Sequence, residues 1–443
     1  MHQPPYLTAR LSALAILLLG AAPGRAQEPA RKPNILFLLA DDLGIADVGC
    51  YGADHAKTPN IDALAKGGTR FTRAYTAPLC GPSRALILTG RYAFRTGAVN
   101  QDQTGDMSPE RETFLPKILK PAGYVTACIG KWGQLPLGPA QFGFDESLRF
   151  QGSGVYWSTQ KKNTSYEVNG QKRSLRDGEY MPDLMHAQLV EFLTKHRTEP
   201  FYVYYSMSHV HSDILPTPDS AKDSKTLYED NLAYMDKLVG KALAELDRLQ
   251  LRENTLVVFF GDNGTAKARS NRATIGGRRL SGEKGSMLEG GGLVPLIVHW
   301  PGKVPADRIC ADLFDASDFV PTFAEVAGAT LPTATKLDGQ SQLASWRGTE
   351  GKRRDWVFQQ LADQFYVRSS GWKLNEKGEL FDMREAPFAE PMVAADRMDG
   401  AAQAARAQLQ AALDQLRPQD GVRDHGDGTG RHANRNSDAK KDK

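Results

Sequence analysis

The segment from Cys80 to Arg91 combines a small nucleophile precursor with residues that attract an anion. Pro82 suits the first turn of a helix, and Gly90 can end that helix. Backbone N–H groups and the positive end of the helix dipole then gather beside Cys80, and Arg84 adds a planar cation. This arrangement predicts attack on a sulfate or phosphate ester. The spacing of Cys80 and Arg84 excludes a Cys-x5-Arg phosphatase loop, and the alternative is a buried cysteine before an ordinary helix.

Two acidic pairs, one of two carboxylates and one of a carboxylate and an amide, follow apolar runs that are typical of buried strands. They are Asp41-Asp42 after residues 34–40, and Asp262-Asn263 after residues 255–260. Buried carboxylates are unfavourable unless a cation neutralises them. A ligand set made only of oxygen atoms suits calcium or magnesium rather than a soft metal. The alternatives are a solvated turn in the first case and an Asp-Asn-Gly hairpin turn in the second.

Basic side chains also stand where predicted strands end. They are Lys131 after residues 124–129, His209 and His211 after residues 201–207, and Lys284 in a glycine-bounded loop. In an extended chain the two histidines would point to the same side. The histidines suit general-acid chemistry or contact with an anion, and the lysines suit contact with an anion. Surface lysines and loop histidines with structural hydrogen bonds are the alternatives.

The apolar strands alternate with helices, which predicts an α/β fold with a mostly parallel sheet. Such sheets bind ligands at the carboxyl ends of their strands, so one edge should gather the polar residues beside the Cys80 helix. The polar stretch 152–176 reads as an irregular loop. From about residue 355 the chain changes to short predicted strands, followed by a helix at 401–416, which predicts a small antiparallel sheet. These strands are 356–361, 365–369, 372–375 and 379–381.

Composition limits the classes of partner. The chain has 443 residues, with 55 Lys and Arg against 52 Asp and Glu, and no basic run long enough to predict binding of nucleic acid. The four cysteines show no CxxC spacing, so neither zinc nor an iron–sulfur cluster is expected, and at most one disulfide is suggested. The cysteines are Cys50, Cys80, Cys128 and Cys310.

The N-terminus has the pattern of an export signal. Arg10 precedes an apolar run at 11–22, and Gly24-Arg25-Ala26 offers a cleavage site. The run is too short for a comfortable membrane span. We therefore expect a signal peptide over residues 1–26 and an exported protein, periplasmic or secreted. An uncleaved anchor and a lipoprotein signal are the alternatives, and the absence of a cysteine just after the run argues against the second.

Taken together, the motifs resemble those of the type I sulfatase family, which is formylglycine-dependent and arylsulfatase-like and lies within the alkaline phosphatase superfamily. The resemblance spans residues 33 to about 416 and implies a catalytic α/β domain at 33–350, with an alkaline-phosphatase-like mixed sheet flanked by helices. It implies a small C-terminal subdomain at 355–417, and a polar, disordered tail is expected at 418–443. The motifs, in the order of the family, are Asp41-Asp42-Leu-Gly, Cys80-Gly-Pro-Ser-Arg84 with Leu-Thr-Gly-Arg, Gly130-Lys131-Trp132, His209-Val-His211, Gly261-Asp262-Asn263-Gly264 and Gly282-Glu-Lys284.

The resemblance also implies a reaction, which is hydrolysis of sulfate monoesters of aryl alcohols or carbohydrates. Cys80 would be oxidised to formylglycine by a maturation enzyme, and the hydrate would attack sulfur. Arg84 would stabilise the hydrate, Lys131 and Lys284 would bind sulfate oxygens, and His211 would protonate the departing alcohol, sharing that role with Lys284. The implied calcium ligands, for which magnesium is an alternative ion, are Asp41, Asp42, Asp262, Asn263 and the residue derived from Cys80.

One position departs from the family pattern. Many relatives read Gly-Lys-Trp-His, and that histidine assists regeneration of the aldehyde, whereas this chain has Gly133 followed by Gln134. Our hypothesis is that His209, or a water held by Gln134, substitutes for it. The glycine could instead widen the site for a particular substrate.

Three other functions remain open. A phosphonate or phosphate monoester hydrolase of the same superfamily would share the formylglycine signature. An inactive relative that only binds sulfated glycan would keep Cys80 unmodified. A generic α/β protein would carry these motifs by chance. No natural substrate is readable from the sequence, because specificity should lie in loops such as 152–176 and 212–225.

Overall fold

The computed structural model describes residues 1–2, 31–160 and 164–431. The described residues from Lys32 onward form one compact unit. The expected signal peptide at 1–26 lies outside the described residues, apart from residues 1–2. Among the residues that are described, no helix has the length and apolar character needed to cross a membrane.

The large unit is built on one mixed sheet of ten strands in the order β12-β2-β11-β8-β1-β7-β3-β4-β5-β6. The five central neighbours, from β8 to β4, run parallel, whereas β11, β5 and β6 pair antiparallel with their neighbours. The predicted α/β fold with a mostly parallel central sheet is therefore confirmed. The strands are β1 (Asn34–Ala40), β2 (Thr69–Tyr75), β3 (Val125–Gly133), β4 (Glu146–Gln151), β5 (Ser165–Val168), β6 (Gln171–Ser174), β7 (Phe201–Ser206), β8 (Thr255–Gly261), β11 (Leu293–His299) and β12 (Arg308–Asp315).

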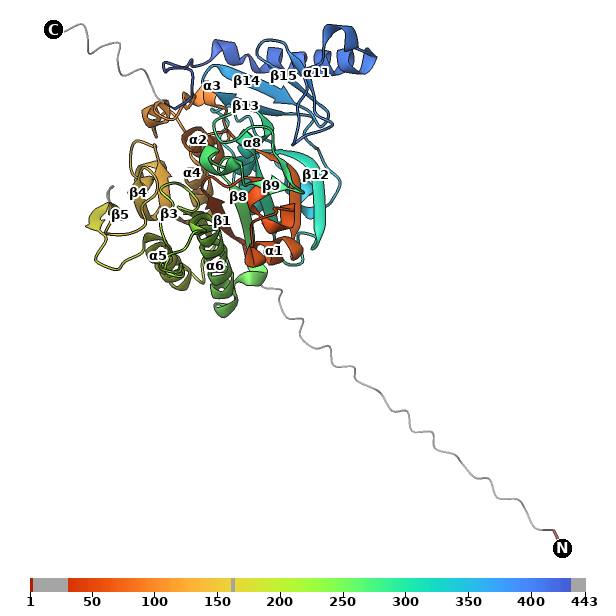
Figure 1. Ribbon diagram of the computed structural model, residues 1–443. Coiled ribbons are helices and arrows are strands. Elements are labelled where there is room, and N and C mark those ends of the chain that lie inside the picture. The colour runs from red at the N-terminus through yellow and green to blue at the C-terminus, as the bar shows by residue number, and fades with distance from the viewer. Residues whose placement is uncertain (3–30, 161–163, 432–443) are drawn as a thin grey trace. The chain divides into compact units, whose positions relative to one another are not determined.

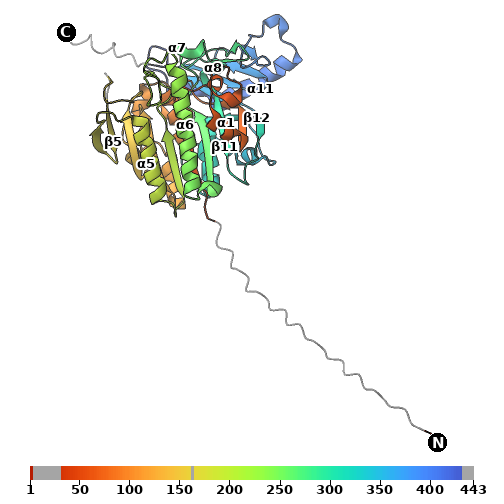
Figure 2. The same ribbon diagram turned by 60° about the horizontal axis from the view of Figure 1, so that its bottom comes forward.

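Helices cover both faces of this sheet, which explains why strand β1 is apolar throughout. Side chains alternate along a strand, so Leu36 and Leu38 pack with α1 (Pro59–Lys66), α5 (Met181–Lys195) and α6 (Leu227–Arg248). Helices α5 and α6 lie side by side on that face (Figure 2). Phe37 points to the opposite face, where α2 (Cys80–Thr89), α4 (Leu115–Leu119) and α9 (Phe319–Ala327) pack.

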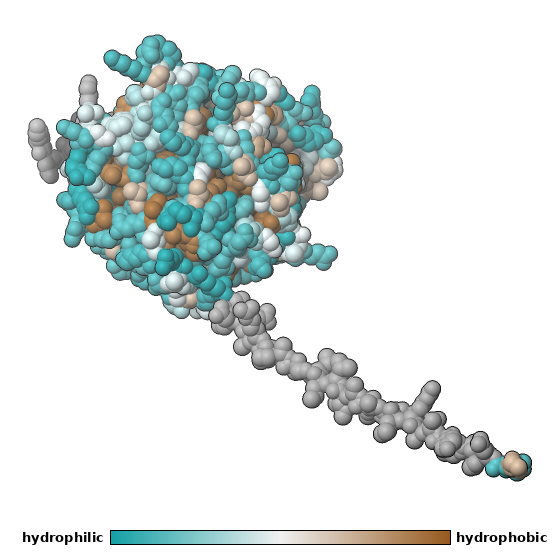
Figure 3. Space-filling view, turned by 90° about the horizontal axis from the view of Figure 1, so that it is seen from below, coloured by the Kyte–Doolittle hydropathy of each residue, from teal (hydrophilic) through white to brown (hydrophobic). Residues whose placement is uncertain are grey.

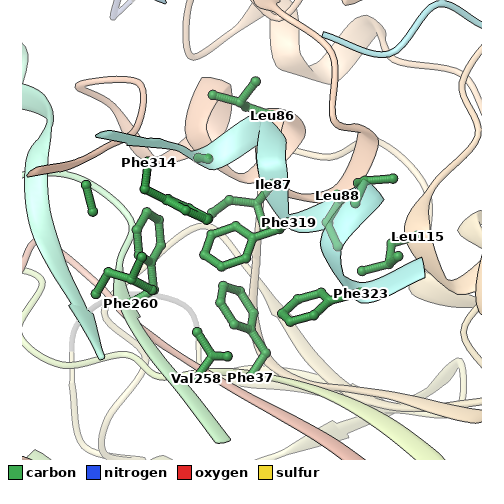
Figure 4. Close-up of a cluster of buried hydrophobic side chains, with 14 of the residues drawn as sticks. Phe37, Leu86, Ile87, Leu88, Leu115, Val258, Phe260, Phe314, Phe319 and Phe323 are labelled. Carbon is green, nitrogen blue, oxygen red and sulfur yellow. The ribbon is translucent and has the colours of Figure 1, made fainter. Parts of the chain in front are cut away.

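The second face anchors helix α2, whose first residue is Cys80. Ile87 and Leu88 of α2 reach towards Phe319 and Phe323 of α9, above Phe37 of the sheet (Figure 4). The ring centroids of Phe37 and Phe319 are 4.8 Å apart in an edge-on arrangement. Helix α2 ends at Gly90, as predicted, with a left-handed φ of 67°. The apolar half of the helix therefore fixes where Cys80 stands.

The small C-terminal sheet has four antiparallel strands, again as predicted, and helix α11 (Gly400–Leu416) packs against it (Figure 1). Phe358, Leu374 and Leu409 of this region belong to the same buried cluster as Phe37. The two sheets thus share one hydrophobic core. The strands are β13 (Val357–Leu361), β14 (Gln364–Arg368), β15 (Trp372–Asn375) and β16 (Leu380–Asp382).

Short elements complete the chain, and the surface between them is mostly polar. One face is covered mainly by hydrophilic residues, with hydrophobic ones in small separate areas (Figure 3). The remaining strands and α-helices of the described residues are β9 (Thr274–Ile275), β10 (Arg278–Arg279), α3 (Ala93–Thr96), α7 (Lys267–Ser270), α8 (Glu289–Gly292) and α10 (Leu343–Arg347). The large apolar side chains exposed among residues 31–160 and 164–431 are Leu137, Leu288, Ile309, Met392 and Val422.

Two segments differ from the sequence-based expectation. Within the stretch 152–176, β5 and β6 form a hairpin that extends the sheet, turning at Asn169 and Gly170 with φ of 51° and 80°. Residues 418–431 do not form a free tail, because backbone hydrogen bonds join Val422 to Phe94 and Gly430 to Gln101. Residues 432–443 of the expected tail lie outside the described part.

Candidate active site

The carboxyl ends of the parallel strands bring the acidic pairs together. Asp41 and Asp42 follow β1, and Asp262 and Asn263 follow its neighbour β8. Strand β3 continues beyond its predicted end at residue 129 as far as Gly133, so Lys131 lies within the strand, opposite Phe150 of β4. The predicted edge thus carries these groups, and Cys80 joins them from the first turn of α2.

Four buried side chains form a set that fits a hard cation. One ligand atom from each of Asp41, Asp42, Cys80 and Asp262 lies within 4.8 Å of the others, and each of these residues is at most 2% exposed. The Oδ1 atom of Asn263 is buried beside them and has no hydrogen-bond partner in the described structure. An unpaired buried carbonyl oxygen is unfavourable, and a cation would satisfy it. The donors present therefore fit calcium or magnesium.

Three basic side chains pair with the three carboxylates. Lys131 Nζ lies 2.7 Å from Asp41 Oδ2, and neither side chain is exposed. Arg84 donates from Nε and Nη2 to Asp262 Oδ2, at 3.1 and 2.7 Å. Lys284 Nζ donates to Asp42 Oδ1. Removing one member of such a buried pair leaves its partner charged and unpaired, which costs about 3–5 kcal/mol.

The surroundings of Cys80 keep its thiol protonated. Burial raises the pKa of Cys80 to about 12, and Asp262 and Asp41 act in the same direction. The Sγ atom lies 3.5 Å from Asp41 Oδ1 and 3.7 Å from Asp42 Oδ1. At neutral pH an unmodified Cys80 is thus a poor nucleophile, because the thiolate is the reactive form.

The helix start differs in detail from the sequence-based expectation. Helix α2 begins at Cys80 itself rather than after Gly81. The N–H group of Gly81 donates to Gln101 Oε1 at 2.9 Å, and that of Ser83 donates to the carbonyl of Leu79. Fewer backbone donors are therefore free for an anion than the sequence suggests, and the positive groups near Cys80 are chiefly Lys131 and Lys284.

The structure separates the two histidines that the sequence pairs. Strand β7 ends at Ser206, so the chain is no longer extended at His209, and the rule of alternating sides does not apply. His209 is fully buried among Tyr156, Tyr180 and Tyr234, and its Nε2 lies 2.9 Å from the Tyr180 hydroxyl. No contact among the described residues joins its ring to the carboxylates. The expectation that His209 acts in catalysis therefore conflicts with its position.

His211 stands at the carboxylate set. Its Nε2 is 3.9 Å from Asp42 Oδ2, and a ligand atom of His211 lies within 4.8 Å of ligand atoms of Asp42 and Cys80. Its Nδ1 contacts the Ser212 carbonyl, so Nδ1 carries the proton and Nε2 faces the cluster. Burial lowers the pKa of His211 to about 4, and nearby Lys131 acts in the same direction. Burial also lowers the pKa of Lys284, but the nearby Cys80 and Asp42 outweigh burial, so the pKa of Lys284 is raised overall.

Gly133 leaves no ready place for a histidine. Its φ of 74° is left-handed, and a Cβ atom there would lie 3.3 Å from Cδ of Arg84. The following residue, Gln134, accepts a hydrogen bond from Gln101 Nε2 at 2.6 Å, while Gln101 also holds the Gly81 N–H group. These two amides link Gln134 to the backbone next to Cys80. Nothing in the spacing of Gln101 marks it in the sequence.

The two loops that carry the acidic pairs are fastened to each other. Asp47, in the loop after β1, accepts a hydrogen bond from the Thr265 hydroxyl in the loop after β8. The backbone of Gly264 packs so closely that a Cβ atom there would lie 1.8 Å from the Gly290 carbonyl oxygen. Sequence reasoning missed Asp47 and Thr265, because single polar residues in loops carry no spacing signal.

Comparisons with known proteins agree on one family. The sulfatase family profile matches residues 33–329. The N-acetylgalactosamine-6-sulfatase of Canis lupus familiaris is 33% identical over 366 residues, which cover 76% of this chain and 70% of the relative. Arylsulfatase A of Homo sapiens is 32% identical over 397 residues, with coverage of 81% and 77%. The crystal structure of Ps i-CgsB in complex with k-i-k-neocarrahexaose superposes with a TM-score of 0.75 and 29% identity, covering 87% of this chain and 93% of that one.

Proposed function

This chain belongs to the sulfatase family, and we propose that it hydrolyses sulfate monoesters with a formylglycine hydrate made from Cys80 beside a bound calcium ion. The observation that carries this proposal is the buried set of Asp41, Asp42, Asp262 and Cys80, whose ligand atoms lie within 4.8 Å of one another. Lys131 and Lys284 stand against the same set and suit an anionic substrate. Sulfate ester hydrolysis is the reaction of the family, and the formylglycine hydrate and the calcium ion are the groups proposed to carry it out in this chain.

The proposed calcium ligands are Asp41, Asp42, Asp262 and Asn263, together with the residue derived from Cys80. The unpaired carbonyl oxygen of Asn263 supports this choice. When bound, the ion would polarise the sulfate group and favour ionisation of the attacking hydroxyl. Arg84 contributes by fixing Asp262, since its two N–H groups hold one oxygen of that carboxylate.

The proposed modification of Cys80 removes the difficulty posed by its raised pKa. A thiol whose pKa is about 12 offers little thiolate at neutral pH. Formylglycine, as its hydrate, would supply one hydroxyl that attacks sulfur and a second whose deprotonation releases sulfate. A maturation enzyme that generates formylglycine is accordingly a proposed partner.

The basic residues have separate proposed tasks. Lys131 and Lys284 bind sulfate oxygens and oppose the negative charge that develops. His211 presents Nε2 to the cluster; in its imidazolium form, with Nε2 as well as Nδ1 protonated, it donates the Nε2 proton to the departing alcohol oxygen, and Lys284 shares this role. A bound sulfate raises the pKa of the neighbouring His211, because an anion favours the charged imidazolium. Since the His209 ring contacts tyrosines rather than the carboxylates, Gln134 is the remaining candidate to hold the water that assists regeneration.

The proposed substrates are aryl sulfates or sulfated carbohydrates. Relatives include arylsulfatase A and N-acetylgalactosamine-6-sulfatase, and Ps i-CgsB was solved with k-i-k-neocarrahexaose. Export through the signal peptide at 1–26 would bring the enzyme to extracellular or periplasmic glycans. Calcium prefers oxygen ligands, and a calcium site is consistent with an exported enzyme.

The test is a paired assay on protein from a host that produces formylglycine. Turnover of 4-nitrophenyl sulfate is measured against 4-nitrophenyl phosphate and an aryl phosphonate ester, with Cys80→Ala as the inactive control. We expect the sulfate ester to give the highest kcat/KM. Preference for the phosphate or phosphonate would favour the alternative hydrolase, and binding of sulfated glycan without any turnover would favour the inactive relative.

A further inference from the structure

The segment that follows helix α11 returns to the neighbourhood of Cys80. After Val422 the segment is held by two side chains that follow α3: the His425 N–H group donates to Gln103 Oε1 at 2.9 Å, and Asn100 Nδ2 donates to the side-chain carboxylate of Asp424. The Gly430 carbonyl then accepts from the Gln101 N–H group at 2.9 Å. Gln101 is the residue whose amide holds the Gly81 N–H group beside Cys80. Gln101 therefore links the segment to Gly81, the neighbour of Cys80.

This attachment places Arg431 at the edge of a hollow of about 310 Å³, which we call the C-terminal hollow. Its charged lining residues are Lys267, Glu283, Lys284 and Arg431. Arg431 Nη2 lies 3.4 Å from the position that a Cβ atom on Gly285 would take. The neighbour of Gly285 is Lys284, which pairs with Asp42 of the carboxylate set. The hollow thus opens directly beside the group proposed to bind the scissile sulfate.

The charges of the hollow favour an anion. Within residues 31–160 and 164–431, no carboxylate pairs with Lys267 or Arg431, and both side chains are exposed to solvent. Glu283 is the single acidic group of the lining, and Lys284 is neutralised by Asp42. Two free cations therefore face one free carboxylate. A guanidinium group is suited to bind sulfate or carboxylate through two parallel N–H donors.

We propose that the C-terminal hollow binds a second anionic group of the substrate, a sulfate or a carboxylate next to the scissile sulfate, through Arg431 and Lys267. This inference rests on the proposed function. It makes the enzyme selective for carbohydrates that carry at least two negative groups. The segment 418–431 would then contribute to substrate binding, because it positions the Arg431 guanidinium group beside the hollow.

The experiment compares substrates that differ by one anionic group. The matured full-length chain is assayed on a disaccharide with one sulfate, with two sulfates, and with one sulfate and one carboxylate. Arg431→Ala and Lys267→Ala are each expected to lower kcat/KM about tenfold on the substrates with two anions and much less on the monosulfate. Comparison of the two substrates with two anions shows whether the hollow prefers a sulfate or a carboxylate. Added salt should reduce the preference for these substrates over the monosulfate.

Arg423→Ala is the matched control, because Arg423 belongs to the same segment and pairs with Asp363 outside the hollow. It should leave all three activities unchanged. Equal losses on every substrate, or no loss with Arg431→Ala, would overturn the inference. Binding of the disulfated disaccharide to unmatured protein is measured by calorimetry as a second readout. If the wild-type protein turns over no sulfate ester but binds the disulfated disaccharide in a way that depends on Arg431, the proposed function is wrong and the proposed anion site in the hollow is supported. If that binding does not depend on Arg431, the proposed anion site is wrong as well.

Discussion

At the scale of single residues, the two histidines of one motif have different surroundings and should have different effects. His211 faces Asp42 and Cys80, whereas His209 shares a hydrogen bond with the Tyr180 hydroxyl and is surrounded by tyrosine side chains. His211→Gln removes the proton donor and should lower kcat by about 10²- to 10⁴-fold. His209→Gln keeps a polar group near Tyr180 and should change kcat only a few-fold, although the protein will be less stable.

Steady-state kinetics and thermal unfolding of both variants check this prediction. Circular dichroism shows whether each variant is folded, so that a loss of kcat can be assigned to chemistry. If His209→Gln lost as much kcat as His211→Gln while remaining folded, the assignment of roles from position would be wrong.

Residue types and their order along the chain already indicate most of the side chains that the structure brings together at the candidate site. Asp41, Asp42, Asp262 and Asn263 are recognisable because each pair stands directly after a buried strand. The paired geometry expected for His209 and His211 requires an extended chain, whereas β7 ends at Ser206. Where a chain leaves its strand depends on tertiary packing, and the local sequence does not determine it.

At the scale of elements, the loops after β1 and β8 hold the carboxylates, and a hydrogen bond from Thr265 to the titratable side chain of Asp47 joins these loops. Burial raises the pKa of Asp47 from 3.8 to about 6, although the hydrogen bond from the Thr265 hydroxyl acts in the opposite direction. The folded state therefore keeps this proton at pH values where the unfolded chain has released it. Stability should fall as pH rises through this window, by ~3 kcal/mol for the whole shift. Asp47→Asn lacks the effect, so its stability relative to wild type should increase from about pH 4 to about pH 7.

Denaturant unfolding of both proteins at several pH values measures this difference. The comparison uses the change with pH rather than the absolute stability, because the substitution also alters the hydrogen bond to Thr265. A difference between the two proteins that stays constant across the window would contradict the raised pKa of Asp47.

A second prediction at this scale concerns Gly264. A Cβ atom there would meet the Gly290 carbonyl oxygen at 1.8 Å, so Gly264→Ala must move the loop that carries Asp262 and Asn263. We expect a loss of about 1–3 kcal/mol of stability, with a larger relative loss of activity. Gly371→Ala is the control, since its Cβ atom would meet nothing within 4 Å. Equal thermal unfolding of the two variants would show that the close contact at Gly264 is unimportant.

Elements with a strong apolar pattern were predictable, and polar ones were not. Strand β1 matches its predicted range, 34–40, because a proline precedes the apolar run and acidic residues follow it. The hairpin of β5 and β6 was missed, because most of its residues are exposed and polar. The pair Asn169-Gly170 was the one available signal, since it is typical of a tight hairpin turn.

At the scale of the whole molecule, the proposed ion should contribute to stability as well as activity. An ion that binds only the folded state stabilises it by about 2.7 kcal/mol at a hundredfold excess over Kd. Chelation should therefore lower both Tm and activity, and calcium should restore them. Asn263→Ala removes the unpaired buried oxygen, so its Tm should respond less to calcium. A Tm and an activity that are both indifferent to chelation would argue against a resident metal.

The arrangement of the whole chain was only partly predictable. The two sheets follow from the change in pattern near residue 355. The course of residues 418–431 does not, because this segment is polar and its hydrogen bonds are made to distant residues such as Gln101 and Gln103. Composition alone gives no information about such partners, because they lie far away in the sequence.

The central claim is that Cys80 becomes formylglycine, and peptide mass spectrometry across Cys80 tests it most directly. The protein should come from its native host or from a host with the maturation enzyme. The account predicts the mass of an aldehyde side chain, or of its hydrate, in place of the thiol. An unmodified Cys80 from such a host would contradict the account, because burial keeps that thiol protonated and the site would then lack a nucleophile.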